Sequence, residues 1–153
     1  MKIQAALFAA AAALVAATPA AANEFRVEAR GGLTFGENQS NEAVIGAAAG
    51  YDYDISEGVF VGLEGSVDKV LIDGSGVILG GTARLGMKEG NSKFFVDGGY
   101  SYLTCDFCND AVHVGLGVEQ PLAGSVYGKV GYRHFFFEGT DSNVVAAGIG
   151  MRF

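Results

Sequence analysis

Residues 25–35 read FRVEARGGLTF, a run in which apolar and polar side chains alternate. The odd-numbered positions from Phe25 to Phe35 are apolar or small, whereas Arg26, Glu28 and Arg30 stand between them. A period of two is typical of a β-strand that has one apolar and one polar face. The stretch therefore predicts a strand whose two faces meet very different surroundings.

Seven further segments alternate in the same way. They span residues 43–55, 59–68, 77–88, 94–102, 111–119, 126–136 and 145–153. Tight turns are expected at 56–58, 89–92 and 121–125, and longer polar connections at 36–42, 69–76, 104–110 and 137–143. An even number of strands of about 9 to 11 residues, joined alternately by short turns and long loops, is typical of bacterial outer-membrane barrels. The predicted fold is all-β, an eight-stranded antiparallel up-and-down transmembrane β-barrel.

Composition excludes other classes. The 153 residues include 10 Lys+Arg and 17 Asp+Glu, a net charge of -7 that argues against a nucleic-acid binder. After residue 22 no apolar run approaches the roughly 18 residues of a spanning helix. Residues 1–22 combine a basic start, an apolar run and small residues before Asn23, so we expect a cleaved Sec-type signal peptide and a barrel domain over 23–153.

The polar faces carry bases and acids in equal numbers, which indicates that these faces point into a narrow lumen where charges must pair. The predicted lumenal charge network consists of Arg26, Glu28, Arg30, Glu64, Arg84, Asp97, Glu119, Lys129 and Arg133. Asp52 and Asp54 are expected to pair with lumenal bases near the short-turn end rather than to bind a metal.

Aromatic side chains fall into two groups. Those on the apolar faces gather near strand ends, as two girdles at lipid interfaces would. Phe60, Phe95 and Tyr127 instead occupy the second, inward position of strands that leave the short-turn end. We expect these three side chains to form a periplasmic plug; the alternative is that they curl under the rim of the barrel.

The last two strands resemble a known family. Residues 145–153 have apolar side chains at every second position and finish with Phe153, which resembles the C-terminal signal read by the barrel-insertion machinery. The stretch YGKVGYR at 127–133 is similar to the penultimate strand of opacity-type outer-membrane proteins. The resemblance implies location in a Gram-negative outer membrane, contact with its lipid, and a structural or surface-interaction role with an unspecified extracellular partner.

The remaining motifs predict no cofactor and no metal. Cys105 and Cys108 have the spacing of a redox or zinc half-site, but they follow a strand in an oxidising compartment, so we expect a local disulfide. His113 is expected to be hydrogen-bonded in the lumen, and His134 to lie at the lipid interface without a serine beside it. The chain is therefore predicted not to be an enzyme.

Two alternatives to a structural or surface-interaction role stay open. One is a narrow pore for small solutes or ions. The other is a periplasmic, lipocalin-like ligand binder, which would need an apolar lumen.

Overall fold

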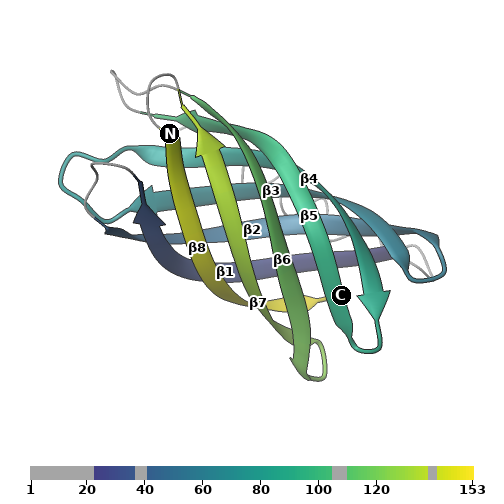
Figure 1. The fold of residues 1–153 in the computed structure, drawn as a ribbon. Helices are drawn as coiled ribbons and strands as arrows, with labels where there is room; N and C mark the ends of the chain where they lie inside the picture. Colours follow the sequence, from purple (N-terminus) through teal and green to yellow (C-terminus); the bar gives the residue numbers. More distant parts are fainter. Residues whose placement is uncertain (1–22, 37–40, 105–109, 138–140) are drawn as a thin grey trace, which may run out of the picture.

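A computed structural model of the chain describes residues 23–36, 41–104, 110–137 and 141–153. It is built from eight strands: β1 (Asn23–Phe35), β2 (Glu42–Ser56), β3 (Val59–Val70), β4 (Val77–Glu89), β5 (Ser92–Leu103), β6 (Ala111–Ala123), β7 (Val126–Phe136) and β8 (Asp141–Arg152). Each pairs antiparallel with the next, and β8 pairs with β1, so the sheet closes into a barrel (Figure 1). The predicted fold class is confirmed. No helix within these ranges is long and apolar enough to cross a membrane.

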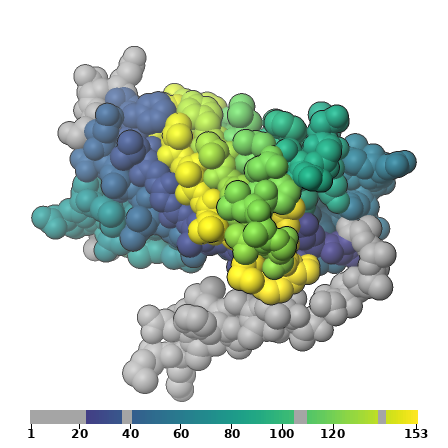
Figure 2. All heavy atoms as spheres, turned by 90° about the horizontal axis from the view of Figure 1, so that it is seen from below, coloured from purple at the N-terminus to yellow at the C-terminus, as the bar shows by residue number. Residues whose placement is uncertain are grey.

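The two ends of the barrel differ. At the short-turn end three two-residue turns each contain a glycine with positive φ, namely Gly58, Gly90 and Gly124. Such φ values suit the tight turns of twisted hairpins. The first and last strands also meet there, because Phe25 and Phe153 exchange backbone hydrogen bonds of 3.1 and 2.8 Å. Figure 2 shows β8 in yellow on the outer surface, between β7 and β1. The opposite end, which carries the longer connections, is called the long-loop end below.

Two predicted boundaries were wrong by four residues, and the others differ by two residues or fewer. β6 continues to Ala123, past Pro121, which the sequence placed in a turn; a register shift between Pro121 and Ala123 accommodates the proline. β8 begins at Asp141 rather than at residue 145, because Phe136 on β7 pairs with Asp141. In both places, pairing with the neighbouring strand continues beyond the residues whose apolar and polar side chains alternate.

The barrel is apolar outside and charged inside. Leu63 and Leu116 on the outward face are 69% and 58% exposed, whereas Arg26 and Glu119 on the inward face are 0% exposed. In a soluble protein, buried positions are mainly apolar, and Arg and Glu are almost never fully buried without a partner. The charged lumen is therefore the candidate functional site.

Candidate functional site

Glu64 on β3 lies at the centre of the lumen and contacts four bases. Its carboxylate is 2.8 Å from Arg26 Nη2 and 2.9 Å from Arg133 Nη2. Arg30 Nη1 and Lys129 Nζ each lie 3.2 Å from it. Because these bases come from β1 and β7, a single carboxylate ties together strands on different sides of the barrel.

A second cluster surrounds Arg84 on β4. Its guanidinium donates to both carboxylate oxygens of Asp52 on β2 and to Glu119 on β6. Asp52 also accepts a hydrogen bond of 3.1 Å from Lys93. Bidentate guanidinium–carboxylate pairs are among the stronger hydrogen-bonded contacts in proteins, so this cluster fixes the short-turn half of the lumen rigidly.

Further ion pairs lie around these two clusters. Toward the long-loop end, Arg30 donates to both oxygens of Asp68 at 2.8 and 2.6 Å. Arg133 lies 3.0 Å from Asp97. Nearer the short-turn end, Lys129 Nζ lies 2.8 Å from Glu28.

All nine residues of the predicted network are brought together here. Among the described residues, the ion pairs inside the barrel join eight bases to eight acids: Arg26, Arg30, Arg84, Lys88, Lys93, Lys129, Arg133 and Arg152 with Glu24, Glu28, Asp52, Asp54, Glu64, Asp68, Asp97 and Glu119. The pair of Lys93 with Glu24 was missed, because both residues lie just outside the predicted strands. Extending the alternation by one or two residues at the strand ends would have found them.

An aromatic layer is built into the same half of the lumen. Phe60, Phe95 and Tyr127 are 0%, 5% and 0% exposed and come from β3, β5 and β7. Each ring lies against a glycine on the following strand, and a Cβ added there would collide with the ring; these glycines are Gly86, Gly117 and Gly150. The glycines therefore leave the space that the three rings occupy.

The aromatic rings and the charges stabilise each other. The Arg84 guanidinium lies 5.1 Å from the ring centre of Phe60 and 5.0 Å from that of Phe95. Arg152 lies 4.7 Å from the Tyr127 ring centre, and the Tyr127 hydroxyl donates to Glu28 at 2.9 Å. Cation–π contacts of this kind strengthen when they are removed from water. The rings fill space between the ion pairs rather than curling under the rim.

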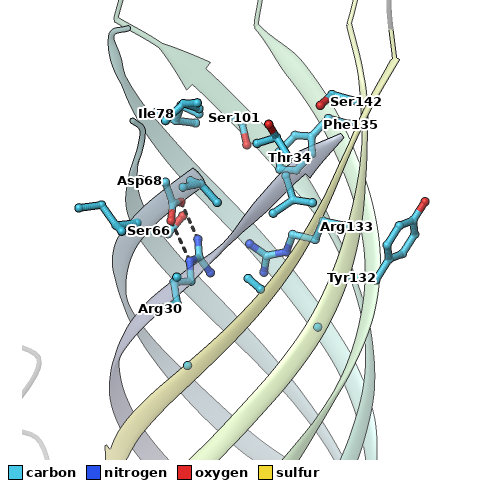
Figure 3. A pocket seen from close by; sticks show the side chains of 18 of the residues that line it. Arg30, Thr34, Ser66, Asp68, Ile78, Ser101, Tyr132, Arg133, Phe135 and Ser142 are labelled. Carbon is cyan, nitrogen blue, oxygen red and sulfur yellow. Dashed lines mark hydrogen bonds and ion pairs between the residues drawn. The ribbon is translucent and has the colours of Figure 1, made fainter. Parts of the chain in front are cut away.

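A cavity of about 420 Å³ occupies the long-loop half of the lumen. Its floor carries the Arg30–Asp68 pair and Arg133, and its upper wall carries Ile78 and Phe135 (Figure 3). Serine and threonine side chains also line it: Ser66 lies beside Asp68 at the floor, and Thr34, Ser101 and Ser142 lie higher, near Ile78 and Phe135.

The inward histidine is held between two hydroxyls. His113 is 1% exposed, and its Nδ1 lies 3.1 Å from Ser101 Oγ and its Nε2 3.0 Å from Thr82 Oγ1. Its ring also packs against Phe135. These contacts account for both ring nitrogens of a buried side chain.

The outward histidine lies at the long-loop end. His134 Nδ1 is 2.8 Å from Asn143 Oδ1, and Nε2 is 3.6 Å from Asp141. The Tyr132 hydroxyl donates to the same Asn143 oxygen. Among the described residues, the hydrogen-bonding and charged neighbours of this ring are thus an amide and a carboxylate.

The other predicted site residues lie elsewhere. Phe153 is 61% exposed on the outside, beside the Phe25 ring. Cys105, Cys108 and residues 1–22 lie outside the described residues. Within the described ranges there is no group of three or more His, Cys, Asp or Glu side chains that could hold a metal ion.

Comparison with known proteins identifies a class through its fold. No protein-family model matches the chain, and no curated protein matches it. Solved structures do match: the N-terminal β-barrel domain of Pseudomonas aeruginosa OprF is 14% identical, covers 85% of this chain and 97% of its own, and superposes with a TM-score of 0.61. The chain thus has the fold of the small eight-stranded outer-membrane barrels.

Two other matching structures are named for different activities. Ail, the attachment invasion locus protein of Yersinia pestis, is 10% identical with a TM-score of 0.59, over 86% of this chain and 99% of its own. The outer membrane enzyme PagL is 15% identical with a TM-score of 0.57, over 82% and 98%. At such identities the likeness concerns the fold alone, and function must be argued from the site.

Proposed function

We propose that this chain is an integral outer-membrane barrel of the opacity type in a Gram-negative bacterium, without catalytic activity and with a structural or surface-interaction role. In this proposal residues 1–22 are a Sec-type signal peptide that is cleaved, and residues 23–153 form the barrel. The short turns face the periplasm, and the long loops face the outside of the cell. An extracellular partner would meet those loops.

The observation that carries the proposal is the inside-out distribution of side chains. Large apolar residues such as Leu63, Met87 and Leu116 are 69%, 62% and 58% exposed on the outward face. Soluble monomers rarely expose large contiguous apolar surface, whereas lipid solvates such a band favourably. The same distribution argues against the periplasmic lipocalin-like alternative, because a water-soluble barrel would present a polar outer face.

The contacts of His134 support a non-enzymatic role, because its hydrogen-bonding and charged neighbours are Asn143 and Asp141. The outward position of Phe153 at the end of the chain's last strand is compatible with recognition by the insertion machinery.

The buried aromatic layer supports a closed barrel rather than the pore alternative. Phe60, Phe95 and Tyr127 are buried among ion pairs across the lumen. Eight strands already enclose an interior that side chains can fill. We expect negligible conductance in planar bilayers, and more leakage from a Phe60→Ala/Phe95→Ala/Tyr127→Ala variant. Stable, ion-selective channels from the unmutated protein would favour the pore instead.

Location and fold can be tested together. The full chain, expressed in a Gram-negative host, should fractionate with the outer membrane and migrate faster on a gel when it is not boiled, as folded barrels do. Recovery in the soluble periplasmic fraction, with no heat-dependent shift, would refute the proposal.

A further inference from the structure

The inward face changes character toward the long-loop end. Beyond the ion pairs, six of the described strands place a large apolar side chain inward, and all six of these side chains line the cavity. We name this set the collar; it consists of Val44, Val70, Ile78, Leu103, Phe135 and Val144. The collar stands above a floor of charged residues, so one cavity has an apolar upper wall and a polar base (Figure 3).

Exposing an apolar ring of this kind to water costs free energy. Removing apolar surface from water contributes about 25 cal/mol per Å², so an apolar group of matching size would be stabilised there. Sites for small molecules have volumes of roughly 300 to 1,000 Å³, mainly apolar walls and a few polar groups. The cavity, at about 420 Å³, falls within this range and has this composition.

The charges of the floor restrict the kind of ligand. Arg30 is paired with Asp68, and Arg133 with Asp97, so these bases and acids already neutralise each other. Glu42 adds a further negative charge to the lining, which disfavours an anion. An anionic head group would also lose its hydration inside the collar without gaining an unpaired base in exchange. Glu42, which could attract a cation, begins β2 at the long-loop end and lies away from the floor.

Hydroxyl groups offer the remaining polar contacts. Ser66 lines the cavity beside Asp68 at the floor, and Ser101, whose hydroxyl also contacts His113 Nδ1 at 3.1 Å, lines it near the level of Ile78 (Figure 3). We propose that the cavity binds a small uncharged molecule with an apolar body held in the collar and one hydrogen-bonding group directed toward these serines, entering from the long-loop end. This binding site is independent of the proposed structural or surface-interaction role.

The test uses the folded barrel in lipid nanodiscs with N-phenyl-1-naphthylamine, an uncharged probe that has one N–H group and fluoresces more strongly in apolar surroundings. Gly131→Phe fills the cavity: Gly131 lines it on β7, and the nearest atom that an added Cβ would meet is the Leu116 carbonyl oxygen at 3.4 Å. Gly81→Phe is the matched control, because an added Cβ at this outward position on β4 has no neighbour within 4 Å.

We expect saturable binding of one probe per barrel in the unmutated protein and in Gly81→Phe, and at least tenfold weaker binding in Gly131→Phe. A second variant, Val44→Thr/Val70→Thr/Val144→Thr, keeps the shape and the branched β-carbons of the collar but makes it polar, and should also weaken binding. This triple variant tests the proposal if Gly131→Phe does not fold. Probe uptake no greater than in empty nanodiscs would overturn the proposal. Saturable binding that neither folded cavity variant weakens would place the probe elsewhere and overturn it as well.

Discussion

Replacing Glu64 by glutamine should destabilise the barrel more than any other single neutralisation of an acid in the lumen. Glu64 is 4% exposed, and it is the one carboxylate among the described residues that contacts Arg26, Arg30, Lys129 and Arg133 together. The variant keeps the shape of the side chain but leaves eight bases and seven acids in the ion-pair network. The excess positive charge cannot reach water easily, because Arg26 is completely buried.

The expected magnitude follows from the partners that remain. Removing one member of a buried ion pair costs about 3 to 5 kcal/mol, because the other charge stays buried without compensation. Here Arg26 still has Glu28 at 3.5 Å and Asp52 at 3.7 Å. We therefore expect a loss near the lower end of that range, about 3 kcal/mol in the free energy of unfolding.

Urea unfolding of the barrel in lipid vesicles, followed by the gel shift of the unboiled protein, measures this loss. Asp54→Asn is the matched control. Asp54 pairs with Lys88, but their side chains are 23% and 33% exposed, so this loss should stay below about 1 kcal/mol. Adding Arg26→Met to Glu64→Gln restores equal numbers of bases and acids, and should recover part of the stability. If Glu64→Gln costs no more than Asp54→Asn, the central role of Glu64 is refuted.

Three other expectations concern the outer face, the glycine contacts and a loop. Leu116→Arg should lower the free energy of unfolding in vesicles by about 2 to 4 kcal/mol. Leu122→Arg, near the short-turn end of the same strand and 61% exposed, should lower it by about 1 kcal/mol or less. Equal losses would contradict a lipid-facing band. Gly86→Val should cost about 1 to 3 kcal/mol because its Cβ would meet the Phe94 carbonyl oxygen and the Phe60 ring, whereas Gly81→Val, whose Cβ has no neighbour within 4 Å, should be tolerated. Similar unfolding midpoints for both would show that the neighbouring strand and Phe60 yield without cost. Cys105 and Cys108 should be oxidised to each other, and Cys105→Ser/Cys108→Ser should assemble normally; labelling of both thiols in the unreduced protein would contradict the disulfide.

The strand alternation was sufficient to predict the number of strands and the orientation of their faces. A strand turns each successive side chain to the opposite face, so Arg26, Val27 and Glu28 reveal both faces without knowledge of any neighbour. Strand ends were harder to place, as Pro121 and Asp141 illustrate, because pairing continues wherever the adjacent strand supplies hydrogen bonds.

The collar is a second feature that local sequence did not reveal. The alternation pattern does not distinguish Val44, Val70 and Ile78 from other positions, and these residues lie near the ends of their strands. They form a ring only after closure of the barrel brings inward positions from many strands to the long-loop end. Sequence therefore predicted charged faces, but not a cavity with an apolar wall.

The sequence by itself determined which residues face inward and that their charges balance. Only the tertiary structure decided which acid pairs with which base. Arg84 on β4 reaches Asp52 on β2 and Glu119 on β6, and Glu64 on β3 reaches bases on β1 and β7. None of these strand pairs is adjacent, so their contacts depend on the closure and stagger of the whole barrel, which a period of two along one strand does not encode.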